Sequence, residues 1–457
     1  MGKKVTFVVT VGIISIMIII TAVSLLFMTT FTQTFSNTDP LMANTSQSAE
    51  ITEANKRRTD NTSSAENTST ANNTSTDNNK GTADETLIES YISEVQNLIK
   101  ETHYKNAQQQ LNKALKVAPE NSALIALQSQ LNTLEKDLVL YKGPIYHVFF
   151  HSLIVYPELC FTGDSMEQGY NDWMTTVREF KLMIQEMYDR GYTLVDLGEL
   201  FKQDASGKMT AQDLYLPKGQ KPLVISVDDM SYYTYMKKDG FAKKLVLDDK
   251  GNPASLIDTP EGKEIISPEG DVVPILNNFV NENPDFSFKG AKGTLALTGY
   301  EGILGYRTNH NNPSWQKEKN DVIPVVAKLK ETGWAFASHS YTHRRTFSEG
   351  TITLNYLKYD TEKWKEEVGS IVGPTNLYIS PFGATFKQKD ARMRYIISQG
   401  FNIYCGVGPS PSYILYKDNV YMERMDLDGY KMHHMPKIMK ELFDVSKVMD
   451  PSRPPFK

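Results

Sequence analysis

Two aspartates and two histidines in this chain have the types and spacing of a catalytic metal site. Asp228 and Asp229 belong to the segment SVDDM, residues 226–230, which follows the apolar run of residues 223–225. Because side chains alternate along a strand, neighbours at its end face different environments, so the two acids can have different roles. His339 and His343 are four residues apart and would share one face of a helical segment. Two histidines with Asp229 leave coordination positions open, which is typical of catalytic metal sites. An acidic turn and an incidental histidine pair are the simpler alternatives for each motif taken alone.

Strands alternating with helices after residue 141 would position these residues. The expected strands are IYHVFFHSLIV, KPLVISV, GTLALTG, WAFASHS, NLYISPF and FNIYCGV. The expected helices are VREFKLMIQEMYDRG, which ends at Gly191 before a short strand and a further helix, VIPVVAKLKETG, EKWKEEVGSIVG and MRYIISQG. Alternation implies parallel pairing, and this many repeats favour a (β/α) barrel over a short open sheet. In both architectures the working residues gather at the carboxyl ends of strands, where SVDDM, SHSYTH and SPFG fall.

The motifs SVDDM, SHSYTH and YISPFG occur in this order, each after a predicted strand. In this arrangement the chain resembles the polysaccharide deacetylases (carbohydrate esterase family 4, the NodB homology domain). That family has a TFDD-like motif, then H-[ST]-x-x-H, then a Pro-aromatic-Gly turn. FFHSLI resembles the opening strand of one branch, and GTLALTG takes the place of a further family strand. The resemblance covers roughly residues 143–430 and implies an α/β fold, a distorted (β/α) barrel.

The resemblance implies catalytic roles in the cleavage of an N-acetyl group. Asp228 would be the general base that takes a proton from the attacking water. A backbone N–H near Phe382 would stabilise the oxyanion, and Pro381 and Gly383 would fix the turn that presents it. The family usually has Tyr where Phe382 stands, and a backbone donor survives that change.

The resemblance also implies the metal ligands. Asp229, His339 and His343 would bind a divalent cation that polarises the acetamide carbonyl and lowers the pKa of a bound water. Zinc is the default cation for two histidines and one aspartate in a hydrolytic site, and cobalt, manganese or iron would also fit.

Two departures from the family pattern concern the groups around the base. The third motif commonly carries an Arg that pairs with the base, whereas residues 379–380 are Ile and Ser here. Arg307 and Arg424 are the candidates to replace it. The family's late histidine, often the general acid, has no clean counterpart. His433 and His434 are the only late histidines, and each is better explained as a surface or structural residue than as the general acid.

The amino-terminal region predicts a membrane anchor. Residues 5–31 carry no charge, and a membrane-spanning helix needs about 20 such residues, whereas a cleavable signal has an apolar core of about 7–15. A retained signal-anchor is therefore predicted, with a cleaved signal as the alternative. Lys3 and Lys4 precede the span and no Lys or Arg follows until Lys56, which puts residues 1–4 in the cytoplasm and the remainder outside the cell. Residues 32–85, rich in Ser, Thr and Asn, predict a disordered linker.

Residues 86–140 predict a small helical segment. The stretch YKNAQQQLNKALKVAPEN resembles one tetratricopeptide-type repeat. One repeat cannot bury its own apolar face well, so the segment either packs on the next domain or binds a protein partner. Residues 141–457 form the predicted deacetylase domain.

An insertion in this domain, at about residues 231–287, is longer than the family's usual connection. Insertions beside active sites often form a wall or lid. Tyr232, Tyr233 and Tyr235 either stack on sugar rings or pack the insertion onto the barrel.

The composition narrows the class of protein. A formal charge of −5 and the lack of a basic stripe argue against a nucleic-acid partner. Cys160 and Cys405 are too few for a disulfide scaffold. Two buried free thiols are predicted, with a single disulfide bridge as the alternative. The leading hypothesis is a membrane-anchored, outward-facing, metal-dependent de-N-acetylase of an N-acetylglucosamine-containing cell-envelope polysaccharide such as peptidoglycan. The alternatives are a catalytically weak or inactive envelope protein that binds glycan or serves as a scaffold, and an adaptor that works through its helical segment.

Overall fold

The computed structural model describes the backbone of residues 78–456 and the side chains of residues 85–456. The tail predicted for residues 1–4, the membrane span predicted for residues 5–31 and most of the linker predicted for residues 32–85 lie outside the described residues. Within residues 78–456 no helix is both long enough and apolar enough to cross a bilayer. The chain divides into two units between residues 89 and 90, and all that follows concerns the second, apart from the start of the first helix.

Three helices begin the described chain: α2 (Asn78–Lys100), α3 (Tyr104–Val117) and α4 (Ser122–Lys136). Asn121 starts α4 because its side chain accepts hydrogen bonds from the N–H groups of Ala123 and Leu124. The apolar stripes of the helices meet in a cluster of their own, formed by Val95, Ile99, Tyr104, Ala107, Leu111, Ala114, Leu124, Leu127 and Leu131. The helical segment therefore has a small core.

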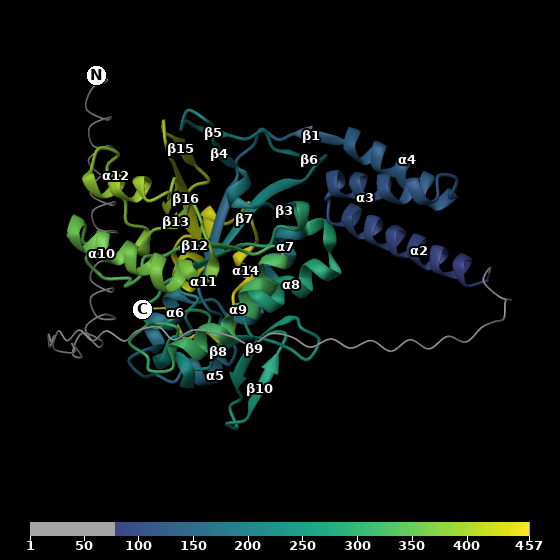
Figure 1. The fold of residues 1–457 in the computed structure, drawn as a ribbon. Helices are drawn as coiled ribbons and strands as arrows, with labels where there is room; N and C mark the ends of the chain where they lie inside the picture. Colours follow the sequence, from purple (N-terminus) through teal and green to yellow (C-terminus); the bar gives the residue numbers. More distant parts are fainter. Residues whose placement is uncertain (1–77, 457) are drawn as a thin grey trace, which may run out of the picture. The chain divides into compact units, whose positions relative to one another are not determined.

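Seven parallel strands of the described chain close into a barrel (Figure 1). Around the ring they are β11 (Thr294–Leu297), β12 (Ala335–Ser338), β13 (Leu377–Ile379), β14 (Ile403–Val407), β16 (Val420–Asp426), β2 (Tyr146–Phe150) and β7 (Lys221–Val227). The ring closes because β7 also pairs with β11, with Leu295 opposite Val227. The predicted parallel α/β barrel is thereby confirmed in place of an open sheet.

Shorter strands lie beside the ring. β3 (Tyr192–Leu194) pairs in parallel with β7, and β15 (Tyr413–Leu415) pairs antiparallel with β16. Two ribbons form from β1 (Leu138–Leu140) with β6 (Tyr215–Pro217), and from β4 (Phe201–Gln203) with β5 (Met209–Ala211). A separate antiparallel sheet holds β8 (Ala242–Leu247), β9 (Pro253–Asp258) and β10 (Glu264–Ser267). This sheet, together with helix α8, occupies much of the predicted insertion at residues 231–287.

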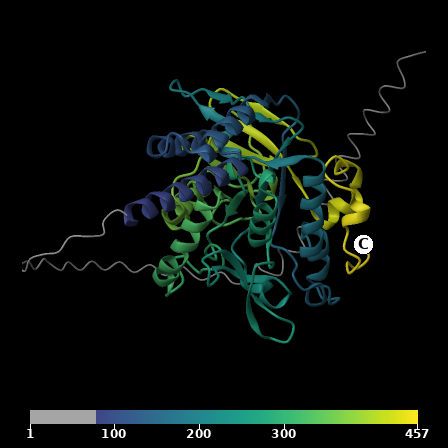
Figure 2. The same cartoon turned by 90° about the vertical axis from the view of Figure 1, so that its right-hand side faces the viewer.

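Helices surround the strands (Figures 1 and 2). They are α5 (Pro157–Cys160), α6 (Glu167–Trp173), α7 (Val177–Asp189), α8 (Val272–Glu282), α9 (Trp315–Glu331), α10 (Leu354–Trp364), α11 (Ser370–Val372), α12 (Ala391–Ser398), α13 (Gly429–His434) and α14 (Val445–Val448). Single turns of 3-10 or π type are η1 (Leu197–Glu199), η2 (Thr234–Lys238), η3 (Pro284–Phe286), η4 (Phe288–Gly290), η5 (Lys365–Gly369), η6 (Pro381–Gly383) and η7 (Pro436–Ile438).

The core has two parts, which strand β7 separates. Leu223, Ile225 and Val227 pack in the large cluster between the strands and the outer helices. Val224 belongs to the smaller cluster that fills the barrel. Since side chains alternate along a strand, the residues of β7 that share the side of Val224 face the barrel interior.

Two sequence predictions about local structure can be settled, and one barrel strand was missed. The further helix expected after Gly191 is wrong: that segment holds only the turn η1, because the chain then enters the β4–β5 ribbon. Strand β16 was not predicted. Cys160 and Cys405 are buried free thiols, as predicted.

Candidate active site

The three predicted metal ligands converge at the mouth of the barrel. Asp229 follows β7, and His339 and His343 follow β12, the strand on the other side of β11. One ligand atom from each residue lies within 4.8 Å of the other two. The histidines do not lie on a helix, as the four-residue spacing had suggested, but in a loop. The loop brings their ring centroids to 4.9 Å from one another.

The hydrogen bonds of these ligands suit a divalent cation. His339 is 2% exposed, and its Nδ1 lies 2.7 Å from the carbonyl oxygen of Ile379, which assigns the proton to Nδ1 and leaves Nε2 for a metal. Asp229 Oδ1 accepts a hydrogen bond of 2.7 Å from the Tyr233 hydroxyl. Burial lowers the pKa of His343 to about 4, so its imidazole is neutral at pH 7, the form that binds metals. Two imidazoles and one carboxylate fit a divalent cation such as zinc.

The backbone at the site is held in an uncommon conformation. Asp229, Ser340, His343 and Phe382 all have positive φ angles, of 57°, 57°, 47° and 57°. Such conformations cost of order 1–3 kcal/mol for a non-glycine residue and persist where the surrounding contacts enforce them. Their concentration in the loops after three barrel strands is typical of a functional site.

Asp228 lies beside the candidate ligands and is 3% exposed. Its Oδ1 accepts a hydrogen bond of 2.7 Å from Arg424 Nη1, which also lies 3.2 Å from Ser226 Oγ. His147 Nε2 is 3.0 Å from the same Ser226 oxygen, so polar groups continue into the barrel. Burial raises the pKa of Asp228, but the charges of Arg424 and His339 and the hydrogen bond from Arg424 together outweigh burial and lower the pKa to about 2. Asp228 is thus an ionised carboxylate at neutral pH.

Of the two candidate arginines, Arg424 is the one that faces Asp228. It comes from β16 and is 1% exposed. Arg307 instead donates hydrogen bonds to the carbonyl oxygens of Ser231, Tyr232 and Glu301.

The two late histidines pack on aromatic rings. His433 stacks on Phe456 at a centroid distance of 4.3 Å, and His434 lies 4.3 Å from Tyr430. Burial and the neighbouring His433 lower the pKa of His434, and the charge of Asp172 opposes this only in part.

The third motif forms a turn after β13. Pro381 is buried, and the ring of Phe382 lies 4.3 Å from that of His343. Gly383 has a φ of 65°, and a Cβ at this position would overlap Val407, so the turn requires glycine. Gly383 N–H and Ala384 N–H bond within the turn. Among the described residues no acceptor is assigned to the N–H of Phe382.

His151 belongs to this site, although the sequence analysis did not single it out. It directly follows β2 and is half-buried. Burial raises the pKa of both aspartates, but electrostatic interactions lower it overall, and His151 contributes to this lowering less than Arg424 does at Asp228 and less than His343 and His339 do at Asp229. The signal was present in FFHSLI, since His151 follows a strand in the same way as the other site residues.

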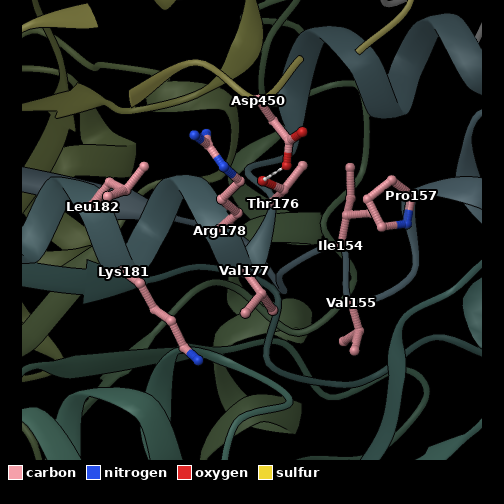
Figure 3. Close-up of a pocket in the computed structure, with 9 residues that line it drawn as sticks. All are labelled: Ile154, Val155, Pro157, Thr176, Val177, Arg178, Lys181, Leu182 and Asp450. Carbon is pink, nitrogen blue, oxygen red and sulfur yellow. Dashed lines mark hydrogen bonds between the residues drawn. The ribbon is translucent and has the colours of Figure 1, made fainter. Parts of the chain in front are cut away.

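A groove that is separate from the candidate metal centre lies at the start of α7 (Figure 3). This groove has a volume of about 460 Å³ and is lined by Ile154, Val155, Pro157, Thr176, Val177, Arg178, Lys181, Leu182 and Asp450. The Thr176 hydroxyl donates a hydrogen bond of 2.8 Å to Asp450. The lining shares no residue with the candidate metal centre, so the chemistry described above lies elsewhere.

The fold and the site define a parallel α/β barrel with a candidate metal centre at its mouth. Comparison with known protein families, with curated proteins and with solved structures found no match for this chain. The assignment of an activity therefore rests on the residues of the site.

Proposed function

We propose that the protein is a metal-dependent de-N-acetylase, a hydrolase of amide bonds in N-acetylglucosamine-containing polysaccharide. The observation that carries the proposal is the ionised, Arg424-paired Asp228 beside the triad Asp229, His339 and His343. Amide hydrolysis needs an activated water, a base and support for an oxyanion. Outward-facing attachment through residues 5–31, predicted from the sequence, favours a cell-envelope polymer such as peptidoglycan.

The residues of the chain have distinct tasks in this mechanism. Asp229, His339 and His343 would hold the cation. A cation bound by them supplies Lewis acidity toward the acetamide carbonyl and lowers the pKa of water. Asp228 accepts the proton of the water as its oxygen attacks the carbonyl carbon, and Arg424 keeps this carboxylate ionised and oriented.

The remaining steps use two further groups. The N–H of Phe382 is the proposed donor to the developing oxyanion. Within the described residues no acceptor is assigned to it, whereas the neighbouring N–H groups of Gly383 and Ala384 are bonded within the turn. His151 directly follows β2, which pairs in parallel with β7 so that Phe150 lies opposite Val227. His151 therefore leaves its strand beside Asp228 and is the proposed proton donor for the leaving amine. The C–N bond then breaks, and the products are acetate and a free amino sugar.

The test uses the full-length protein, stripped of metal with a chelator and reloaded with zinc or cobalt. Acetate release is measured from N-acetylglucosamine oligomers and from peptidoglycan. Asp228→Asn should retain the metal and lose activity by about 10²–10⁴-fold, the usual contribution of a general base, whereas His339→Ala should lose both metal and activity. His433→Ala is the matched control and should change neither the metal content nor the activity. Tight metal binding without acetate release on any glycan would instead favour the non-catalytic glycan-binding or scaffold protein.

A further inference from the structure

Three tyrosines from two loops form a stack beside the candidate metal centre. Tyr233 and Tyr235 follow β7, and Tyr300 follows β11. Because β7 and β11 pair with each other, these loops meet on one side of the barrel mouth. The ring centroid of Tyr233 lies 5.8 Å from that of Tyr235, with an interplanar angle of 10°, and 5.3 Å from that of Tyr300, with an angle of 22°. These three residues are called the tyrosine stack below.

Hydrogen bonds connect the tyrosine stack to the site. The Tyr233 hydroxyl donates to Asp229 Oδ1 and lies 3.0 Å from Thr298 Oγ1. The backbone N–H of Tyr300 donates to the carbonyl oxygen of Tyr341 at 3.1 Å, and Tyr341 lies between the two candidate histidine ligands in sequence. The position of Tyr300 relative to the candidate metal centre is therefore set through both loops that carry ligands.

Arg307 holds the two loops together. Its guanidinium donates to the carbonyl oxygens of Ser231 and Tyr232 in one loop, at 3.0 and 2.6 Å, and to that of Glu301 in the other, at 2.7 Å. The carboxylate of Glu301 in turn accepts hydrogen bonds from the backbone N–H and the hydroxyl of Thr234. A surface that is held in place before a ligand arrives loses less conformational entropy on binding.

The members of the stack differ in their access to solvent. Tyr233 is 5% exposed: its ring packs between those of Tyr235 and Tyr300, and its hydroxyl donates a hydrogen bond to Asp229. Tyr300 is 37% exposed. A pyranose ring carries C–H bonds on its faces and hydroxyl groups around its edge, so a sugar can cover an aromatic face while its hydroxyls stay in water. Removal of such apolar area from water stabilises a complex.

We propose that Tyr300 determines substrate specificity by binding the pyranose ring next to the sugar whose N-acetyl group reacts. The inference rests on the proposed function and extends it: the substrate is a glycan chain of at least two sugars, not a monosaccharide. The alternative, a surface tyrosine that only closes the stack, predicts no contribution to sugar binding.

The test measures binding without turnover. The probes are N-acetylglucosamine and its β-linked tetramer, titrated calorimetrically into the full-length, zinc-loaded Asp228→Asn protein. Adding Tyr300→Ala should weaken tetramer binding about tenfold, equivalent to about 1.4 kcal/mol, and should narrow the affinity difference between tetramer and monosaccharide. Tyr300→Trp, which keeps an aromatic face, should retain the difference. Tyr215→Ala is the matched control, because Tyr215 is 47% exposed and lies on β6, and it should bind like the parent.

Two results would overturn the inference: tetramer affinity that Tyr300→Ala leaves unchanged, or no sugar binding by the parent protein. Thermal unfolding and zinc content of the variants establish that they are folded. The acetate assay separates this inference from the proposed function. If sugar binding depends on Tyr300 but the unsubstituted protein releases no acetate, the deacetylase proposal is refuted and the sugar site is retained. If the unsubstituted protein releases acetate but sugar binding does not depend on Tyr300, the sugar site is refuted and the deacetylase proposal is retained.

Discussion

Replacement of Arg424 by methionine removes the cation that faces Asp228 while keeping most of the volume of the side chain. Arg424 is 1% exposed, and its guanidinium lies 4.1 Å from the ring of Phe149 in addition to its bond with Asp228. In the variant the Asp228 carboxylate stays buried and loses its partner. An unpaired buried charge of this kind costs about 3–5 kcal/mol.

The pH dependence follows from the pKa of Asp228. In the native protein it is about 2, against about 3.9 for an unfolded aspartate. A lowered pKa contributes stability that is present above about pH 4 and lost as the pH falls through 2, worth about 2.6 kcal/mol. Without Arg424, burial raises the pKa of Asp228 above its ordinary value. The variant can then relieve its unpaired charge by taking up a proton, so the cost of the substitution should be larger at pH 8 than at pH 5.

Urea unfolding of the chelator-treated full-length protein at both pH values measures this cost. Arg394→Met is the matched control, because Arg394 pairs with Asp418 at the surface, with side chains 45% and 32% exposed. Exposed pairs contribute about 0–1 kcal/mol. Equal costs for the two substitutions, or a cost for Arg424→Met that grows as the pH is lowered, would refute the assigned role of the buried pair.

Two further predictions concern single polar groups. Tyr233→Phe removes the donor to Asp229 Oδ1 but keeps the ring, so zinc affinity should fall about 10–100-fold in a calorimetric titration; unchanged affinity would mean that this hydroxyl does not orient the ligand. Burial raises the pKa of Asp271 to about 6, although its Oδ1 accepts hydrogen bonds from the N–H groups of Leu153 and Val272. The folded state therefore keeps this proton to a higher pH than the unfolded state does. As the pH rises from about 4 to about 6, the free energy of unfolding should fall by up to about 3 kcal/mol. Asp271→Asn cannot ionise and should lack this loss in urea unfolding at pH 4.5 and 7.5, and an unaltered pH slope would contradict the assignment.

Strand β7 illustrates what local sequence predicts well. KPLVISV is an apolar run, and it forms a strand over Lys221–Val227, because a strand covered on both faces needs no alternation of polar residues. Strand β16 shows the opposite case. Glu423 and Arg424 interrupt its apolar pattern, and the charge of Arg424 is acceptable inside the barrel because Asp228 neutralises it.

The loop after β12 shows a second limit of local patterns. The four-residue spacing of the histidines suggested a helix, but Ser340 and His343 have positive φ angles that end any helical course. The rings still converge, because the loop folds back over the barrel mouth and His339 bonds to Ile379 of the next strand. The grouping of Asp229, His339 and His343 inferred from the residue types thus agrees with the structure, while the local conformation inferred from the histidine spacing does not.

Local patterns in the chain are sufficient for most of the barrel strands, the barrel class and the grouping of the acidic and histidine motifs at strand ends, because hydrophobic periodicity and turn residues act over a few positions. Three features depend instead on the closure of the barrel. They are the arginine that pairs with Asp228, the histidine that lies beside the triad after β2, and the tyrosines that stack beside Asp229. The Arg424–Asp228 bond joins residues 196 positions apart. A contact at that separation follows from the packing of seven strands around one interior, since no short-range interaction along the chain distinguishes Arg424 from Arg307.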